Sequence, residues 1–388
     1  MRGGTTGPLT SHGSPLTVVI AGGGTGGHLM PALAIAEAIR RRHPDWRVLL
    51  VGASRGVEAA LLPSRSFPYE LLPAEPIYRR QWWKNLRWPM VGLRLVRAVD
   101  RLLDRERPAL VVGTGGYASG PVVWRAAGRG IPTAVQEQNA YPGLSTRLLV
   151  RRVREVWLGV PEARRYLRPG SHTEVMDTGN PITPPDPSRR DGALARFGLD
   201  PGKPVLLVTG GSQGSRAINR AVAEWIDRGT GKTRGTGKTG GTGSGLQVVW
   251  AAGKATYPEF QHYHDPPRVQ VFDFLDPMAD AYAVATMAIS RAGMMTIAEL
   301  CAWGIPSVLI PLPTAAADHQ TPNARVMAES GAAVSLPQSS LTGDRLATVI
   351  AELLHTPGGL DQMARSALAR ARPDAVERIS DRIGFLSG

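Results

Sequence analysis

Short apolar runs that end in glycine or polar residues alternate along the chain with amphipathic stretches. In the first half the runs are residues 16–23, 47–53, 109–116 and 132–139. Between them, residues 31–42 and 91–107 carry apolar side chains at helical spacing, with arginines on the other face. This alternation predicts βαβ units, and therefore a parallel, doubly wound α/β sheet.

The same pattern restarts in the second half at residues 204–215, a strand candidate followed by a glycine-rich turn and a helix start. The proline-rich stretch 178–190 between the halves is typical of a linker. We therefore expect two Rossmann-like domains whose parallel sheets face a cleft. The expected boundaries are a flexible tail over 1–15, a first domain over 16–178, a second over 179–365, and a C-terminal helix over 366–388 that could pack back onto the first domain.

Composition narrows the class of protein. Apolar residues make up 43% of the 388, which excludes wholesale disorder, and the single cysteine, Cys301, excludes a disulfide-stapled fold. No apolar run approaches the ~18 residues of a membrane span, and the N-terminus lacks an apolar signal core. We expect a chain that stays in the cytoplasm.

Charge is unevenly distributed. The net charge is +13, but residues 1–180 hold 25 Lys and Arg against 13 Asp and Glu, a balance of +12. The first half is therefore the one expected to meet a polyanion: a nucleic acid, an anionic membrane surface or a phosphorylated substrate. An arginine-rich proteome is the alternative explanation.

The first glycine-rich loop covers residues 21–28, between a strand and a helix. Gly22, Gly24 and Gly27 satisfy the dinucleotide-binding spacing, but the acid expected at the end of the second strand is missing before Glu58, which disfavours a nicotinamide dinucleotide. Glycines and a helix N-terminus still suit an anion. His28 on this loop is either a structural residue or a proton acceptor.

Five further loops follow strand candidates, where open α/β sheets bind ligands. They are residues 115–121, 136–139, 210–215, 290–299 and 318–321. The loop at 210–215 is a second candidate anion site, and Glu299 can accept both hydroxyls of a ribose diol. The chain has no Asp-x-Asp pair and no metal-spaced His/Cys cluster, so we expect backbone amides in loops 22–28 and 210–215, and no bound metal, to balance the charge of an anionic ligand such as a diphosphate.

Two segments of the sequence allow more than one structural interpretation. Residues 77–90 combine three tryptophans, one tyrosine and four cations, which suits an anionic membrane surface; a core-packed loop with a basic rim is the alternative. Residues 228–245 contain GKT twice, but the glycine that a phosphate-binding loop needs is absent, so we expect a flexible insertion.

Seven motifs occur in an order that resembles the MurG family, the UDP-N-acetylglucosamine transferases of bacterial cell-wall synthesis. They are GGTGGH (23–28), GGYASGP (115–121), EQN (137–139), GNP (179–181), GGSQG (210–214), SRAGMMTIAE (290–299) and DHQT (318–321). The resemblance covers residues 16–380 and implies a two-domain GT-B fold. The implied activity is inverting transfer of N-acetylglucosamine to lipid I, giving lipid II for peptidoglycan synthesis, and so for cell shape and division. No cofactor or metal is implied.

The resemblance also assigns residues. It makes His28 the candidate base, the first domain the lipid-acceptor domain and the second the donor domain. The implied donor contacts are Thr25, Gly26, Gly27, Asn139, Ser212, Leu275, Met294, Met295, Thr296, Ile297, Ala298, Glu299 and Gln320. The implied acceptor side comprises Gly115, Gly116, Tyr117, Ser119 and Glu137.

Two positions depart from the family pattern. Gln136 stands where relatives often have histidine, which removes a possible second base. Thr183 stands where an arginine usually follows GNP, so a cation near the donor phosphates is missing and Thr183 is a doubtful ligand.

The implied partners are UDP-N-acetylglucosamine, lipid I and the anionic inner leaflet of the cell membrane, with the protein peripheral on the cytoplasmic side. Three alternatives stay open: a UDP-N-acetylglucosamine 2-epimerase of the same fold, a transferase for another glycolipid, and a nucleic-acid-binding protein. The last is disfavoured because no zinc-finger or RNA-binding signature is present.

Overall fold

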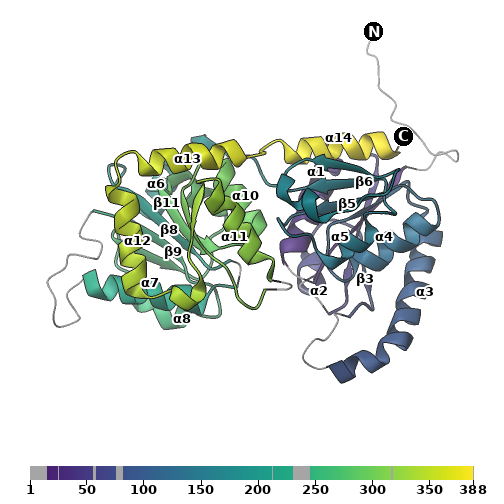
Figure 1. The fold of residues 1–388 in the computed structure, drawn as a ribbon, viewed down its shortest axis with the longest axis horizontal. Coiled ribbons are helices and arrows are strands. Elements are labelled where there is room, and N and C mark those ends of the chain that lie inside the picture. Colours follow the sequence, from purple (N-terminus) through teal and green to yellow (C-terminus); the bar gives the residue numbers. More distant parts are fainter. Residues whose placement is uncertain are drawn as a thin grey trace, which may run out of the picture. The chain divides into compact units, whose positions relative to one another are not determined.

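The chain was analysed as a computed structural model that describes residues 15–24, 26–55, 58–75, 82–211, 213–229, 245–315 and 318–387. It consists of two compact units (Figure 1). Unit 1 comprises residues 1–183 and 373–388, and unit 2 comprises residues 184–372. Each unit is described by itself below.

Unit 1 is built on a parallel sheet of seven strands in the order β3-β2-β1-β4-β5-β6-β7. The strands are β1 (Thr17–Ala21), β2 (Arg47–Ala53), β3 (Tyr69–Leu72), β4 (Leu110–Gly113), β5 (Thr133–Glu137), β6 (Glu155–Leu158) and β7 (Glu174–Asp177). The helices that connect them are α1 (Gly26–Arg42), α2 (Glu58–Leu61), α3 (Trp88–Glu106), α4 (Ser119–Gly128) and α5 (Leu144–Leu149). Every strand pair is parallel, as the βαβ pattern predicted.

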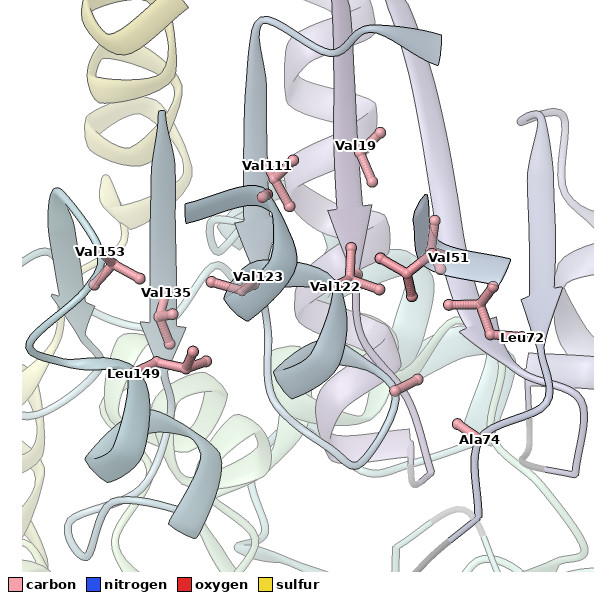
Figure 2. Packing of buried hydrophobic residues seen from close by; sticks show 14 of the residues in the cluster. Val19, Val51, Leu72, Ala74, Val111, Val122, Val123, Val135, Leu149 and Val153 are labelled. Atoms are coloured by element: carbon pink, nitrogen blue, oxygen red, sulfur yellow. The ribbon is translucent and has the colours of Figure 1, made fainter. Parts of the chain in front are cut away.

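Alternate residues of these strands feed two separate cores, because neighbouring side chains in a strand point to opposite faces. Val19, Val51 and Val111 pack on one face with Val122 and Val123 of α4 (Figure 2). The other residues of the same strands pack on the opposite face beneath α1. The sheet is therefore buried on both sides, which is why its strands read as continuous apolar runs.

The C-terminal helix α14 (Ala375–Ser387) belongs to unit 1. Ile379, Ile383 and Leu386 lie in the same core as α1, and Arg382 pairs with the buried Glu155 of β6. The stretch expected as one helix over 366–388 is thus divided. Its beginning is the end of α13 (Gly359–Arg370), which belongs to unit 2.

Unit 2 is a second parallel sheet, of six strands in the order β10-β9-β8-β11-β12-β13. The strands are β8 (Val205–Thr209), β9 (Gln247–Ala251), β10 (Val269–Phe272), β11 (Met287–Arg291), β12 (Ser307–Ile310) and β13 (Ala333–Ser335). Its helices include α6 (Arg190–Phe197), α7 (Arg216–Gly229), α8 (Tyr257–Phe260), α9 (Met278–Val284), α10 (Met294–Ala302), α11 (Gln320–Glu329) and α12 (Gly343–His355).

Each sheet has one point where the strand order reverses. In unit 1 it lies between β1 and β4, and in unit 2 between β8 and β11. Ligands of open α/β sheets bind at the carboxyl ends of the strands at such a point. The glycine-rich loops at 22–24, 114–117, 210–215 and 292–293 follow these four strands.

The division between the units falls after Thr183, inside the expected linker and five residues beyond the expected boundary at 178. The predicted tail and most of the predicted insertion over 228–245 lie outside the described residues. Within the described part of the chain, no helix is both long and apolar enough to span a bilayer.

The packing of α14 makes a prediction about stability. Replacing Ile383, which is fully buried, by alanine should lower the free energy of unfolding of unit 1 by about 2–5 kcal/mol through the cavity left behind. Phe385 on the same helix is 71% exposed, so Phe385→Ala should change it by less than about 0.5 kcal/mol. Denaturant unfolding of both variants measures the difference; equal effects would contradict the packing of this helix.

Candidate functional site

In unit 1 the loops after β1 and β4 are in backbone contact. Gly23 donates its N–H to the carbonyl of Gly115 (3.3 Å), and a Cβ added at Gly116 would collide with the carbonyl of Gly23. A Cβ at Gly24 would lie 2.6 Å from Cε1 of Tyr117. Gly115 and Gly116 also have positive φ angles of 95° and 85°. Glycine is thus required here both for the conformation and for the close approach.

This contact holds His28, in the first turn of α1, against the loop after β4. The carbonyl of His28 accepts a hydrogen bond from the Thr114 hydroxyl (2.8 Å), and a Cβ at Gly115 would lie 2.7 Å from Cδ2 of the imidazole. His28 is half-buried, whereas Gly27 is exposed. The structure therefore brings together His28, Gly115, Gly116 and Tyr117 as neighbours. Ser119, in contrast, is buried at the start of α4.

A buried carboxylate that the sequence analysis did not single out as a site residue lies beneath the same loop. Glu58, at the start of α2, is fully buried, and its Oε1 accepts the N–H of Gly24. Burial raises the pKa of this carboxyl above its usual range. The amide of Gly24 is one of those expected to balance a departing diphosphate, and in the structure it is already occupied by a carboxylate.

Glu137 organises the loop after β5 and is itself buried. Its Oε1 accepts the N–H and the side-chain amide of Asn139 (3.0 and 3.2 Å), and its Oε2 accepts Gly143 N–H and the Thr146 hydroxyl (2.9 and 2.6 Å). Four donors on one carboxylate make Glu137 a structural anchor that places Asn139. Asn139 itself is only partly buried.

Gln136 lies in the interior. It is fully buried, and its Nε2 donates to Oδ1 of Asn180 (3.0 Å), whose own amide donates to the carbonyl of Gln138 (3.2 Å). This position therefore supports the chain leaving β7 and does not offer a base to a substrate. Thr183 is exposed at the last residue of the N-terminal segment of unit 1.

In unit 2 the glycine-rich loop after β8 leads into α7, and Arg291 lies beside it. The guanidinium of Arg291 donates to Ser215 Oγ (2.7 Å), to Gln338 Oε1 (2.7 Å) and to the carbonyls of Ile310 and Pro311. All these acceptors are neutral, and no carboxylate of the described chain lies within ion-pair distance of it. Desolvation lowers the pKa of Arg291. Arg291 lies within the predicted loop at 290–299, but no role was predicted for it from the sequence.

Glu299, in α10, is held by a residue that sequence reasoning missed. The buried Tyr282 of α9 donates its hydroxyl to Glu299 Oε2 (2.8 Å). Burial raises the pKa of the Glu299 carboxyl, and the tyrosine hydrogen bond opposes that rise. Oε1 of Glu299 has no hydrogen-bond partner within the described residues, so one oxygen is fixed and the other can accept a ligand hydroxyl.

The other predicted donor contacts in residues 294–299 differ in their burial. Met294 and Ile297 point into the core, while Met295, Thr296 and Ala298 are partly exposed. The side chain of Leu275 is also buried in the core. Met294, Ile297 and Leu275 can therefore contact a ligand through their backbone but not through their side-chain ends.

Gln320 begins α11, close to the end of β12. Its Oε1 accepts Leu312 N–H (3.0 Å), which leaves the amide nitrogen as a donor. Asn323, one turn on, donates to the carbonyl of Ala292 (3.1 Å) and so ties α11 to the loop after β11. Thr25 and Ser212, both predicted donor contacts, lie outside the described residues.

Each unit thus presents a different chemistry at its switch point. Unit 1 offers an imidazole in the first turn of α1, held against the glycine loop after β4, and unit 2 offers a cation beside the loop after β8, a carboxylate on α10 and an amide at the start of α11. Over the ranges described, no group of three His, Cys, Asp or Glu residues is arranged to hold a metal ion. The residues present suit an acid–base reaction on a ligand that carries hydroxyl and anionic groups.

Comparison with known proteins identifies the family to which both units belong. Residues 18–158 match the glycosyltransferase family 28 N-terminal domain, and residues 205–379 match its C-terminal domain. A UDP-N-acetylglucosamine–N-acetylmuramyl-(pentapeptide) pyrophosphoryl-undecaprenol N-acetylglucosamine transferase from Desulforamulus reducens is 37% identical, over 94% of this chain and 97% of its own. The enzyme of the same description from Desulforudis audaxviator is 38% identical, over 96% and 99%.

Solved structures show the same architecture. The crystal structure of Acinetobacter baumannii MurG aligns with a TM-score of 0.72 at 27% identity, covering 95% of this chain and 99% of that one. A UDP co-structure of Staphylococcus aureus MnaA aligns with a TM-score of 0.67, covering 95% and 96% of the two chains. At 12% identity, that second likeness concerns the fold alone.

Proposed function

Because the chain belongs to the MurG family of family 28 glycosyltransferases, we propose that it transfers N-acetylglucosamine from UDP-N-acetylglucosamine to lipid I, giving lipid II for peptidoglycan synthesis. The observation that carries this proposal is the match to these relatives over nearly the whole length of the chain. The sites described above, one in each unit, contain the acid–base and anion-binding groups that such a transfer needs. Unit 1 takes the lipid acceptor and unit 2 holds the donor.

On the acceptor side, His28 acts as the general base. It removes the proton from the attacking hydroxyl of lipid I as that oxygen bonds to the anomeric carbon, and UDP leaves from the opposite face, so the configuration inverts. The contact between loops 22–24 and 114–117 fixes His28 in place, which a base needs if it is to reach the hydroxyl within hydrogen-bond distance.

On the donor side, Glu299 and Gln320 bind the nucleotide sugar, and the loop after β8 faces the leaving diphosphate. Arg291 lies directly against Ser215 of that loop and supplies a positive charge that no nearby carboxylate cancels. A fixed cation and helix amides stabilise developing negative charge without a bound metal.

The direct test is incubation with labelled UDP-N-acetylglucosamine and lipid I in the presence of a chelator. We expect labelled lipid II and free UDP. Release of a labelled epimer without lipid I would instead support the 2-epimerase alternative, whose fold this chain shares with solved epimerases at 14% identity. Turnover that stops with chelator and returns with magnesium would contradict metal-independent stabilisation.

His28→Ala should lower kcat by about 10²–10⁴-fold, the usual contribution of a general base. The KM for UDP-N-acetylglucosamine should stay near its wild-type value, because His28 acts on the acceptor. His43 lies at the far end of α1, stacked on Trp46, so His43→Ala is the control and should keep full activity. A kcat for His28→Ala within about tenfold of wild type would refute the assignment.

The raised pKa of Glu299 makes donor binding depend on pH. The ribose hydroxyls donate to the ionised carboxylate, so KM for UDP-N-acetylglucosamine should rise as the pH falls through that raised pKa, at a pH where an ordinary glutamate is still ionised. Tyr282→Phe removes the hydrogen bond that lowers the pKa and should move this rise to higher pH. Glu299→Gln should raise KM and abolish the pH dependence, whereas Glu352→Gln, at an exposed position of α12, should change neither. A pH-independent wild-type KM would contradict the role.

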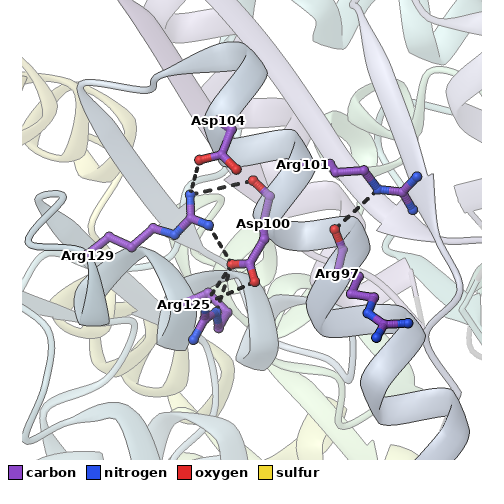
Figure 3. Close-up of polar contacts among 6 residues, drawn as sticks. All are labelled: Arg97, Asp100, Arg101, Asp104, Arg125 and Arg129. Atoms are coloured by element: carbon purple, nitrogen blue, oxygen red, sulfur yellow. Dashed lines mark hydrogen bonds and ion pairs between the residues drawn. The ribbon is translucent and has the colours of Figure 1, made fainter.

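Unit 1 also contacts the anionic inner leaflet, and this places the enzyme at the cytoplasmic side of the membrane. Of the predicted membrane segment, residues 77–81 lie outside the described part. Leu86, just before α3, and Met90 and Leu93, in its first turns, are 73%, 61% and 51% exposed. Further along α3, Asp100 neutralises Arg125 of α4 and Arg129, which directly follows that helix (Figure 3).

Three other arginines of α3, Arg94, Arg97 and Arg101, have no carboxylate within ion-pair distance over the described residues. Exposed apolar side chains beside unneutralised cations on one helix suit an anionic lipid surface.

Vesicle flotation tests this contact. The protein should float with vesicles that contain phosphatidylglycerol and much less with pure phosphatidylcholine. Replacing Arg94, Arg97 and Arg101 by serine should weaken partitioning roughly 100-fold, at about 1 kcal/mol per cation. The control removes three exposed arginines of unit 2, Arg220, Arg325 and Arg345, for the same loss of charge. Equal effects of the two triple variants would discard a specific surface on α3.

A further inference from the structure

Glu58 occupies a space that the surrounding glycines leave for it. A Cβ added at Gly52, in β2, would lie 2.8 Å from Cβ and Cγ of Glu58, and one added at Gly23 would collide with its carboxylate. The side chain is fully buried, which is rare for a glutamate without a charged partner. Gly23, Gly52 and Glu58 come from three separate segments, and the two glycines thus leave a buried space beneath the loop after β1 that the glutamate side chain fills.

The two oxygens of this carboxylate differ in their hydrogen bonding. Oε1 accepts the N–H of Gly24. Oε2 is buried and has no hydrogen-bond partner in the described part of the chain. No Lys, Arg or His among the described residues lies within ion-pair distance of either oxygen. A buried polar atom left unpaired costs free energy, so space-filling alone, which an apolar side chain would do better, does not explain Glu58.

The bond to Gly24 acts on the loop that carries His28. Gly24 lies between Glu58 on one side and the ring of Tyr117 on the other. It comes just before α1, whose N-terminal amides and dipole attract negative charge. The Glu58 carboxylate therefore takes the place that a ligand anion would otherwise occupy at this amide.

We propose that Glu58 is a positioning residue of the transfer reaction: by accepting the N–H of Gly24 it locks the loop after β1, and thereby the imidazole of His28, in the geometry that attack requires. This inference rests on the proposed function.

Two nearly isosteric variants separate the hydrogen bond from the packing. Glu58→Gln keeps an oxygen that can accept the N–H of Gly24, and Glu58→Met fills the same space without an acceptor. Displacement of a catalytic group by about 1 Å can cost about 100-fold in rate. We therefore expect Glu58→Met to lower kcat by about 100-fold with the KM for UDP-N-acetylglucosamine within about twofold of wild type, and Glu58→Gln to keep kcat within about threefold.

Glu155 provides the matched control, since it is a buried carboxylate of unit 1 at the opposite end of the strands, paired with Arg382. Glu155→Gln should lower the melting temperature but leave kcat unchanged. If Glu58→Met does not fold, Glu58→Asp replaces it. The aspartate side chain is one methylene shorter, which withdraws the carboxylate from the N–H of Gly24. The same loss of kcat at constant KM is expected.

Failure of the positioning role and failure of the proposed function give different results. Equal kcat for Glu58→Met (or Glu58→Asp) and wild type would overturn the positioning role, and so would a Glu58→Gln variant as inactive as Glu58→Met. Failure of the wild-type enzyme itself to make lipid II would instead count against the proposed function.

Discussion

The contact between the loops after β1 and β4 is the constraint on which the acceptor site depends. Two backbones meet there with no side chain between them, which is possible only because Gly23, Gly115 and Gly116 have none. The imidazole of His28, the ring of Tyr117 and the carboxylate of Glu58 all pack against this junction. A similar close approach occurs in unit 2, where a Cβ at Gly214 would collide with the carbonyl of Ala252, the residue after β9. In each unit, glycines therefore let the loops after two neighbouring strands meet.

The two switch points differ in the charge that lies behind the glycine loop. In unit 1 an internal carboxylate, Glu58, already meets the loop amide, whereas in unit 2 the cation Arg291 lies beside the loop with only neutral acceptors. Unit 1 therefore carries an imidazole beside a loop amide that is already hydrogen-bonded, and unit 2 carries a cation that no nearby carboxylate neutralises. A glycosyl transfer uses both, because its nucleophile must lose a proton and its leaving group departs as a diphosphate.

Much of the fold could be predicted from the sequence, because the inner strands are long apolar runs that end in glycine. The strands at or near the sheet edges, β3, β6, β7 and β13, were missed, since each has only three or four residues and little hydrophobic contrast. The glycine loops and Glu299 were found as motifs. Tyr282 and the roles of Glu58 and Arg291 were not, because their contacts join residues 17, 34 and 76 positions apart. No local pattern encodes such pairings.

The assignment of α14 to unit 1 has a consequence for how the protein is made. Unit 1 takes its first 183 residues from the start of the chain and its last helix from the end, with all of unit 2 between them. A growing chain can therefore bury the core of unit 2 while still attached to the ribosome. The face of unit 1 beneath α14 stays uncovered until α14 itself has left the exit tunnel, so unit 1 completes its folding only after the whole of unit 2 has been synthesised.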